Sequence, residues 1–504
     1  MTDSLLSIGR VFTPLDWAKW LIIESGAFRA WEQGAEILDP TCGDGAFLEA
    51  FIALGSKKDP NSLQDWASRL FGIEINTADK NTFLKRIWEK YSIEFPASNF
   101  ICCDILEDRA TKVVDFIVGN PPWSNFSDLP PAAKDRWANH FITHGLVKSK
   151  KDVLLGKSRA DLCALVIKKC IDINLRPHGR ASFFAPLSIL FNDGANDRMR
   201  PYPSSRHGYA IESVWDLEGQ EIFDGVATRY GVIDFVKDRD QTWPVRTMVM
   251  QNGVWCKTLS TSSDRKSGGW IRHETDGFLA SAPRIIARPA NKPRQGVNTG
   301  GANDVFVLSK SGSTFIESSG CAVDIERELL FPLMQKAQFS GESVTVENAL
   351  KWIIVPHDSR SGRPLSWSEL ARYPNAMKYL SRHQDTLKNR KGVLIGSNIS
   401  KGIWWSLLGV GPYSFSPWKV AWESLGKKAF RPVLLDGTWQ GNQAMHAYCP
   451  CDTKEEAEAL LEALKAKEIE GWLKSFSMDG TCNWAQPGKV AKIFNFELEQ
   501  LSLI

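Results

Sequence analysis

The first half of the chain alternates short apolar runs with amphipathic stretches. Apolar runs typical of buried strands lie at residues 35–38, 70–73, 100–102, 113–118, 181–186, 211–217 and 231–236. The stretches that begin at residues 46 and 160 have the spacing of helices with one apolar face. This alternation predicts an α/β fold with a doubly wound, Rossmann-like sheet.

The pattern changes beyond about Lys237. Trp, Gly and Pro become frequent, the apolar runs shorten, and the alternation of strands and helices disappears. Residues 453–470 are predicted to form an amphipathic helix, with a Glu-rich start and a Lys-rich end that suit the helix dipole. We therefore expect two domains, residues 1–240 and an irregular, β-rich α+β domain at residues 241–504.

Three of the predicted strands end in a carboxylate, namely Asp39, Glu74 and Asp104. A single acid at the end of a strand can occur by chance, whereas all three are much harder to explain in that way. The carboxyl ends of parallel strands meet at one edge, where doubly wound sheets bind ligands. Asp39 favours a cationic or polar ligand over a diphosphate. Glu74 is placed to bind a ribose diol, and Asp104 could accept a hydrogen bond from an adenine amino group.

A glycine turn follows the first of these acids. Gly43 and Gly45 allow the backbone to approach a ligand closely, and the next helix begins with its positive dipole end at that point. The turn has no third glycine at the spacing of the dinucleotide fingerprint. The sequence therefore predicts a small-molecule site that is not a dinucleotide site.

The strand at residues 113–119 ends in Asn120-Pro121-Pro122-Trp123. Two consecutive prolines have a fixed φ and no N–H group, so the loop is stiff and its acceptors point outward. An amide, a carbonyl and an aromatic ring at one strand tip can hold a planar substrate that carries an exocyclic amino group. The alternative interpretation is a proline-rich strand exit with no chemical role.

The segment 39–47, Glu74, Asp104 and the Asn120–Trp123 turn together resemble the motif series of S-adenosylmethionine-dependent amino-methyltransferases. Residues 9–18 resemble the extra cofactor motif of the γ class of DNA adenine-N6 methyltransferases, which precedes the glycine motif there as it does here. Residues 294–306 and 330–334 resemble the target-recognition region of TaqI-type modification enzymes. The resemblance spans nearly the whole chain, strongly up to about Lys237.

The resemblance implies a site-specific DNA-methyltransferase (adenine-specific), the modification component of a restriction–modification system. Such an enzyme transfers a methyl group from S-adenosylmethionine to N6 of an adenine flipped out of duplex DNA. Catalysis would fall to Asn120, Pro121, Pro122 and Trp123. The cofactor would be held by Thr13, Pro14, Asp39, Pro40, Gly43, Gly45, Glu74, Ile75, Asp104 and Ile105. Phe223 would supply a second ring against the base, or would be an ordinary core residue.

The total charge of the chain does not indicate DNA binding, because the net charge is only +3 over 504 residues. DNA binding must come from local basic stretches. Three such stretches lie at residues 148–159, 284–294 and 377–401. From them we predict DNA contacts by Lys148, Lys151, Arg294 and Lys391. Each stretch alone could be a solvated loop.

The ten cysteines form no disulfide framework, and Cys449 and Cys451 have no second pair at zinc spacing, so no metal is expected. No signal pattern and no apolar run long enough to cross a bilayer is present. These features predict a soluble protein of the prokaryotic cytoplasm, without membrane contact.

Five alternatives are considered at this point. The same catalytic turn could act on RNA, on a protein glutamine, or on cytosine N4. A fused restriction enzyme is disfavoured because the cofactor motif begins at about Gly9, and a non-catalytic DNA-binding subunit is disfavoured by the intact Asn120 and Asp39. We expect a stand-alone methylase with double-stranded DNA as its substrate and a separately encoded restriction endonuclease as its possible partner.

Overall fold

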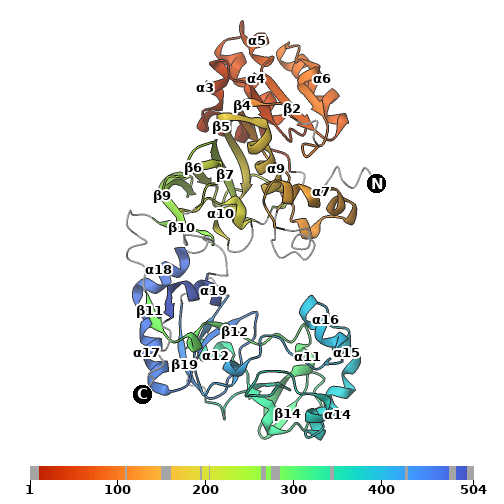
Figure 1. Cartoon of the computed structure of the whole chain (residues 1–504), viewed down its shortest axis with the longest axis vertical. Coiled ribbons are helices and arrows are strands. Elements are labelled where there is room, and N and C mark those ends of the chain that lie inside the picture. Colours follow the sequence, from red (N-terminus) through yellow and green to blue (C-terminus); the bar gives the residue numbers. More distant parts are fainter. Residues whose placement is uncertain are drawn as a thin grey trace. The chain divides into compact units, whose positions relative to one another are not determined.

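A computed structural model divides the chain into two compact units, residues 1–280 and 281–504 (Figure 1). The structure describes residues 11–107, 111–148, 161–192, 196–203, 205–226, 228–262, 268–273, 284–340, 345–425, 430–475 and 484–496.

The first unit is built on one large mixed sheet. Its strands are β1 (Ile37–Asp39), β2 (Leu70–Glu74), β3 (Phe100–Cys102), β4 (Val114–Gly119), β5 (Leu175–Pro186), β6 (Tyr209–Asp216), β7 (Tyr230–Lys237), β8 (Val245–Gln251), β9 (Val254–Ser262) and β10 (Trp270–His273). The spatial order is β10-β9-β8-β6-β7-β5-β4-β1-β2-β3. Strands β3, β2, β1, β4 and β5 run parallel, and β7 is antiparallel to both β5 and β6. The predicted Rossmann-like sheet is confirmed.

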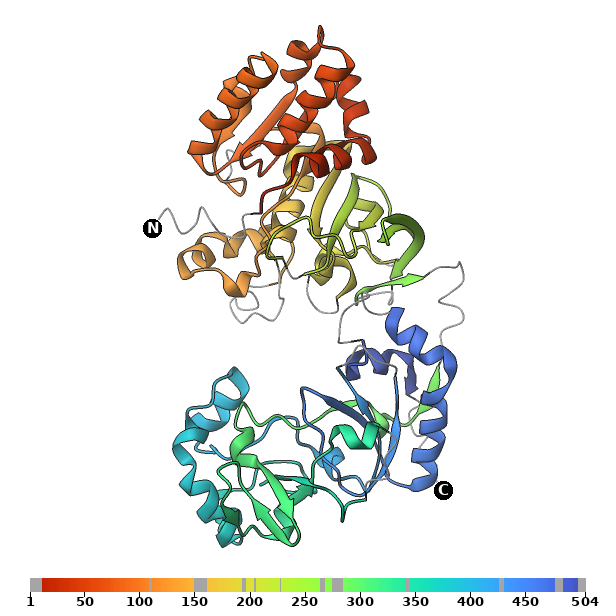
Figure 2. The same ribbon diagram turned by 180° about the vertical axis from the view of Figure 1, so that it is seen from behind.

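Helices flank this sheet in Figures 1 and 2. They include α2 (Leu15–Glu24), α3 (Ala27–Glu32), α4 (Ala46–Lys58), α5 (Leu63–Ala67), α6 (Thr77–Tyr91), α7 (Pro131–Thr143), α9 (Leu162–Lys169) and α10 (Ser188–Phe191). The helix α4 is the central one, because it contacts α2, α5, α6 and β2. Its residues Phe47, Leu48 and Phe51 are buried in the core that also contains the strand residues Ile37 and Val118.

The first unit extends further along the chain than the sequence indicated. Strand β8 pairs in parallel with β6, and β9 and β10 continue the same sheet. The compact unit therefore ends at residue 280, whereas the sequence placed the boundary at residue 240. The added strands follow one another as antiparallel neighbours with no helix between them, so they lack the alternation from which the boundary was predicted.

The second unit is an irregular α+β structure, as predicted. One sheet has the order β12 (Arg294–Gln295), β20 (His446–Cys451), β18 (Trp418–Glu423), β19 (Val433–Asp436). Another has the order β15 (Ala322–Val323), β14 (Thr314–Ile316), β13 (Val307–Ser311), β17 (Lys351–Ile354), β16 (Leu330–Pro332), and β11 (Ile285–Ala287) pairs with β21 (Phe494–Phe496). Its helices are α11 (Asn303–Phe306), α12 (Lys336–Phe339), α13 (Trp367–Leu370), α14 (Pro374–Arg382), α15 (Gln384–Lys388), α16 (Val393–Ser400), α17 (Lys454–Lys465), α18 (Lys467–Ser475) and α19 (Pro487–Val490).

The helix predicted over residues 453–470 is in fact two helices. Helix α17 ends at Lys465, Ala466 adopts an extended ψ of 137°, and α18 begins at Lys467. Each helix buries its own apolar residues, Leu460 and Leu464 in α17 and Trp472 in α18. Within the described residues, no helix is long and apolar enough to span a membrane.

Candidate active site

An open cleft lies at the carboxyl ends of the central parallel strands. Its empty volume, including the open space at its mouth, is about 950 Å³. Ten of the residues predicted from the sequence line it: Thr13, Asp39, Pro40, Gly43, Glu74, Ile75, Asp104, Ile105, Asn120 and Pro122. The strand order places them together because β3, β2, β1 and β4 are neighbours that run in the same direction.

Asn120 follows the last residue of β4, and its side-chain amide is fixed in one orientation. The Nδ2 group donates to Thr13 Oγ1 at 3.2 Å and to the Val11 carbonyl at 3.4 Å. Since a carbonyl can only accept, the amino side of the amide must face Val11. Its Oδ1 atom is buried and has no hydrogen-bond partner within the described structure. A buried acceptor without a donor costs about 1–3 kcal/mol, so this atom is suited to a donor on a ligand.

Pro121 and Trp123 of the Asn120–Trp123 turn are not among the residues that line the cleft, and Trp123 lies in an aromatic cluster. Its ring centroid is 5.0 Å from Phe223, edge to face, and 5.3 Å from Tyr230. Tyr230 accepts a hydrogen bond from the Ile222 N–H at 2.8 Å, which fixes the loop that carries Phe223. Phe223 is only 4% exposed and also packs against Phe184. Of the two interpretations of Phe223, its burial favours a core residue that supports Trp123.

The glycine turn is held by Glu74. This carboxylate accepts from the N–H groups of Gly43 and Asn76, both at 2.9 Å. Gly43 has a φ of +54°, and no atom lies within 4 Å of the position that a Cβ would take. The backbone at Gly43 is therefore open toward the cleft, where a bulky ligand can approach it.

Gly45 and Pro14 do not line the cleft, although the sequence placed them with the cofactor residues. Gly45 has a φ of +87°, and a Cβ there would lie 2.2 Å from Cδ2 of Phe83. Pro14 is exposed and precedes α2, where its carbonyl accepts from the N–H groups of Trp17 and Ala18. Both residues shape the start of a helix, and neither contacts the cleft directly.

We expect Gly45→Ala to destabilise the protein by about 1–3 kcal/mol, because the new methyl group needs both a strained φ and movement of Phe83. Urea unfolding measures this change. Gly26→Ala is the matched control, since Gly26 has a φ of +79° at the start of α3 but no atom within 4 Å of a Cβ. Equal losses in the two variants would show that the ring moves away without cost.

Asp39 is a buried carboxylate, 1% exposed, at the end of β1. It accepts from the Thr41 N–H at 3.2 Å, and no Lys or Arg pairs with it among the described residues. Burial raises the pKa of Asp39 well above its usual range, and the charges of Glu74 and Asp44 raise it further. A cationic group in the cleft would offset this unfavourable charge.

Asp104 already has protein partners on both oxygens. Oδ1 accepts from the Leu106 N–H at 2.9 Å, while Oδ2 accepts from Trp137 Nε1 at 3.0 Å and pairs with Arg136 at 3.1 Å. A carboxylate has about four acceptor positions, so this group can still accept from a ligand. Trp137 and Arg136 hold it in place.

Sequence reasoning missed the residues that support the cleft from distant segments. Arg86 of α6 donates to Glu49 at 2.7 Å and also binds the Asp44 carbonyl, which anchors the glycine turn. The Leu162 N–H of α9 donates to the Ser124 carbonyl at 2.9 Å, directly after the Asn120–Trp123 turn. The apolar lining of the cleft includes Val11, Phe47, Trp137, Leu162 and Val166. Val11 and Phe47 fall inside the sequence motifs of the resemblance, whereas no motif contains Trp137, Leu162 or Val166.

Of the predicted DNA contacts, Lys148, Arg294 and Lys391 are not among the residues that line the cleft. Lys148 and Lys391 are exposed, and Lys151 lies outside the described residues. Arg294 is half-buried with its guanidinium 4.4 Å from the Tyr413 ring. Arg288, from the same basic stretch, forms ion pairs with Asp452 and Glu456, so its charge is balanced within the second unit.

A family model described as N-6 DNA Methylase matches residues 3–267, which is more than half of the chain. The chain belongs to the N-6 DNA methylase family. This membership confirms the predicted enzyme class, a methyltransferase that acts on adenine N6 in DNA. Among the described residues of this N-6 DNA methylase, no group of three or more His, Cys, Asp or Glu side chains could hold a metal ion.

Named relatives agree with the family. The Type II methyltransferase M.NspV of Nostoc sp. is 25% identical over 447 residues, which cover 80% of each chain. The Type II methyltransferase M.BstVI of Geobacillus stearothermophilus is 24% identical over 70% of this N-6 DNA methylase and 66% of that protein. The structure of the Type IIL restriction-modification enzyme MmeI in complex with DNA matches with a TM-score of 0.53 and 13% identity. That match covers 94% of this chain and 65% of the longer chain of MmeI, and it shows a shared fold.

Proposed function

We propose that the protein is the modification methyltransferase of a restriction–modification system, with the γ-class arrangement of TaqI-type enzymes. It transfers a methyl group from S-adenosylmethionine to N6 of an adenine flipped out of duplex DNA. The observation that carries the proposal is the buried Oδ1 atom of Asn120, an acceptor at the cleft without a donor in the described structure. The names of the Type II relatives support the place in a restriction–modification system.

The cleft fits S-adenosylmethionine by its chemistry. The unpaired charge of Asp39 suits the cationic methionine part, and the open backbone at Gly43 leaves room for close approach. Glu74 suits the ribose diol, and Asp104 beside Ile105 suits the adenine. Phe47, Leu162 and Val166 supply apolar walls. The cofactor, when bound, supplies the electrophilic methyl group.

The catalytic turn can activate an aromatic amine. The lone pair of an adenine amino group is delocalised into the ring, which makes the nitrogen a poor nucleophile. In our proposal, Asn120 Oδ1 and the Pro121 carbonyl accept hydrogen bonds from its two N–H groups and favour tetrahedral geometry, which localises the lone pair. Each such preorganised acceptor contributes about 2–4 kcal/mol in the transition state. The bond from Asn120 to Thr13 fixes the amide beforehand, so little reorganisation remains.

Trp123 offers a stacking surface for the extruded base. Flipping a base out of the duplex costs a few kcal/mol, and stacking on an aromatic ring returns about 1–3 kcal/mol. The contacts of Trp123 with Phe223 and Tyr230 keep the indole ring in one position. We propose that Trp123 stacks on the target base, while Phe223 and Tyr230 support Trp123 from the core.

The test is incubation of the purified protein with methyl-labelled S-adenosylmethionine and mixed-sequence genomic DNA, followed by digestion to nucleosides. Label in N6-methyladenine is the expected result. Label in N4-methylcytosine would keep the mechanism but change the base. Absence of label in DNA, with the cofactor still bound, would overturn the proposal and direct the same assay to RNA and to protein glutamine.

We further propose a separately encoded restriction endonuclease as the partner, with both proteins acting on the DNA of a prokaryotic cytoplasm. The support is the family and the Type II names of the relatives. Chromosomal DNA from the source cells should then be methylated at every recognised site, and sequencing that detects N6-methyladenine would reveal any unmodified sites.

A further inference from the structure

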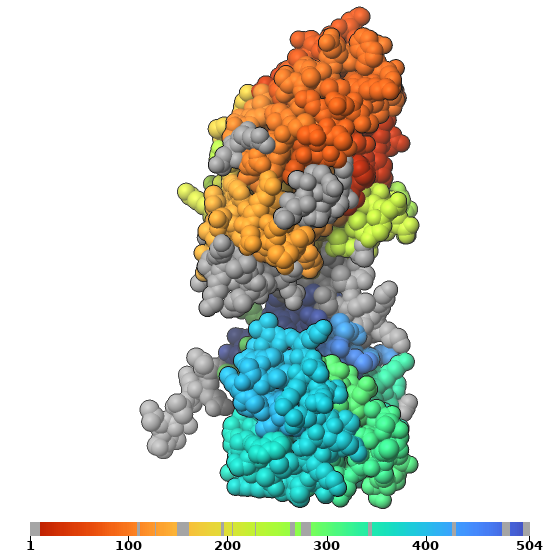
Figure 3. Space-filling view, turned by 90° about the vertical axis from the view of Figure 1, so that its right-hand side faces the viewer, coloured from red at the N-terminus to blue at the C-terminus, as the bar shows by residue number. Residues whose placement is uncertain are grey.

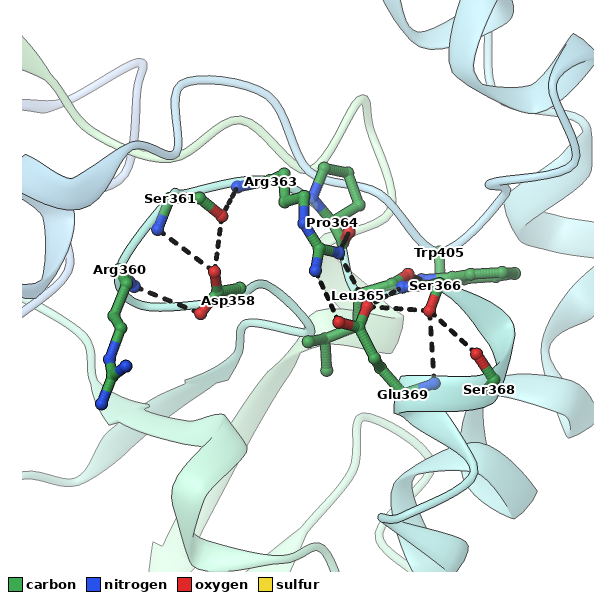
Figure 4. A network of polar contacts seen from close by, with 10 residues as sticks. All are labelled: Asp358, Arg360, Ser361, Arg363, Pro364, Leu365, Ser366, Ser368, Glu369 and Trp405. Atoms are coloured by element: carbon green, nitrogen blue, oxygen red, sulfur yellow. Dashed lines mark hydrogen bonds and ion pairs between the residues drawn. The ribbon is translucent and has the colours of Figure 1, made fainter.

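The loop between β17 and α13 in the second unit, residues 357–366, is braced along its whole length (Figure 4). At its start, the His357 side chain is buried, with Nε2 3.0 Å from the Leu407 N–H and Nδ1 2.9 Å from the Gly362 carbonyl. Only a neutral ring with the proton on Nδ1 satisfies both contacts. Burial lowers the pKa of His357 to about 4, which keeps the ring neutral.

The tip of the loop is held by Asp358. Its carboxylate accepts from the N–H groups of Arg360 at 3.3 Å and Ser361 at 3.2 Å, and from the Ser361 hydroxyl at 2.5 Å. Gly362 has a φ of +72°, and a Cβ there would lie 2.3 Å from Cα of Gly411, so the loop is packed closely against its neighbour. The backbone of residues 358–362 therefore has little freedom.

The end of the loop is closed by a two-pronged ion pair. The two terminal nitrogens of Arg363 bind the two carboxylate oxygens of Glu369 at 2.7 and 2.5 Å. Glu369 also accepts from the N–H and hydroxyl groups of Ser366, both at 2.8 Å, at the start of α13. Trp405 Nε1 donates to the Leu365 carbonyl at 3.0 Å.

Arg360 stands apart from this network. Figure 4 shows its guanidinium pointing away from the other labelled side chains, with only its backbone N–H in a hydrogen bond. Its side chain is exposed, and no carboxylate or carbonyl of the described residues binds the guanidinium. Arg363 stabilises the loop through Glu369, whereas the side chain of Arg360 extends from the loop into solvent. A fixed backbone that carries one free, fork-shaped donor is suited to recognition of a ligand outside the protein.

The loop is attached to the same segment as the predicted DNA contact Lys391. Arg390 donates to the carbonyls of Trp404 at 2.6 Å and Ser406 at 2.9 Å, and the next residue along, Leu407, donates to His357. The segment 404–407 thus joins the braced loop to the α15–α16 region, which forms part of the near face of the second unit in Figure 3. Exposed lysines of helices α14 to α16 and the turns beside them include Lys378, Lys388, Lys391 and Lys401. Their charge complements the phosphate backbone of DNA.

We propose that Arg360 reads a guanine in the recognised DNA sequence, a role that rests on the proposed function. The guanidinium fork matches the O6 and N7 atoms of guanine in the major groove, which makes Arg–guanine the commonest specific contact. A phosphate can be reached by a cation on a flexible loop as well as by one on a fixed loop. A fixed backbone limits the positions that the guanidinium can reach before DNA binds, which favours readout of one base.

The test compares methylated sites across mixed-sequence DNA for the wild type, Arg360→Ala and Asp358→Ala, with N6-methyladenine mapped by sequencing. The expected wild-type motif contains a G·C pair that Arg360→Ala no longer requires, with a loss of roughly 5- to 150-fold at the original sites. Asp358→Ala should relax the specificity for the same base pair although the Arg360 side chain is retained, because the backbone that carries Arg360 is no longer held by Asp358. Arg372→Ala, another exposed arginine of this unit, is the matched control and should keep the full motif.

Three outcomes would overturn the assignment. A wild-type motif without a G·C pair excludes it. A uniform loss at all sites in Arg360→Ala, with the salt dependence of binding reduced by about one phosphate contact, would make Arg360 a backbone contact. An unchanged motif and rate would remove Arg360 from the interface. Failure of the proposed function is distinguishable, since the wild type would then produce no N6-methyladenine.

Discussion

Asn120→Ala is expected to reduce the methylation rate by at least about 100- to 1,000-fold while S-adenosylmethionine binding is retained. The variant loses an acceptor that is oriented in advance by Thr13 and Val11, and removal of one preorganised group of this kind has an effect of that size. Labelled methyl transfer to DNA measures the rate, and calorimetric titration measures cofactor binding.

The same substitution should change the free energy of unfolding by less than about 1 kcal/mol, because removal of a buried oxygen without a donor offsets loss of the hydrogen bonds to Thr13 and Val11. Thermal unfolding therefore separates loss of chemistry from loss of structure. Asn125→Ala is the matched control, since Asn125 lies on the same loop but is exposed and bonds only to Asp128 through its side chain in the described contacts. Retention of more than a tenth of the activity in Asn120→Ala would exclude the acceptor role.

Asp39→Asn is expected to weaken S-adenosylmethionine binding by at least about 30-fold, which corresponds to about 2 kcal/mol for loss of a buried charge partner. The ligand-free protein should respond in the opposite direction and become more stable. The raised pKa of Asp39 means that the folded state holds its proton more tightly than the unfolded state does. Its stabilising contribution is complete below the unfolded pKa near 4 and is lost as the pH rises through the folded pKa.

Asparagine cannot ionise, so the stability gain of Asp39→Asn should be larger at pH 8 than at pH 5. Urea unfolding at the two pH values measures this difference, and Asp16→Asn is the control because the Asp16 side chain is 93% exposed. The same gain at both pH values would mean that Asp39 does not carry a buried charge. Unchanged cofactor affinity would remove it from the binding site.

The central part of the cleft was predictable because its information is local. Asp39, Glu74, Asp104 and Asn120 each follow a recognisable strand, and parallel strands bring their carboxyl ends to one edge without any knowledge of side-chain packing. Gly43 was predictable for the same reason, as part of the first strand–turn–helix unit. Their roles toward the cofactor and the base stay predictions until the experiments above are done.

The supporting contacts were not predictable, because they join segments far apart in the chain. Arg86 reaches the Asp44 carbonyl from α6, and Trp137 reaches Asp104 from α7. Gly45 was grouped with the ligand contacts because a glycine motif does not distinguish room for a ligand from room for a ring such as Phe83. The boundary predicted at residue 240 lies before the end of the first compact unit at residue 280. Strands β8–β10 extend the edge of the sheet, but no helices alternate with them, and this alternation is the sequence pattern that marks a doubly wound unit.

The hydrogen bond from the Leu162 N–H to the Ser124 carbonyl has a thermodynamic consequence. Leu162 lines the cleft, and Ser124 directly follows Trp123 in the chain, so one bond links the wall of the cleft to the turn that, in our proposal, holds the base. If occupancy of the cleft shifts α9 and thereby changes the affinity for the extruded base, the base must change the affinity for the cofactor by the same factor. The two substrates would then bind cooperatively in either order, and the coupling could be measured from whichever side is experimentally easier.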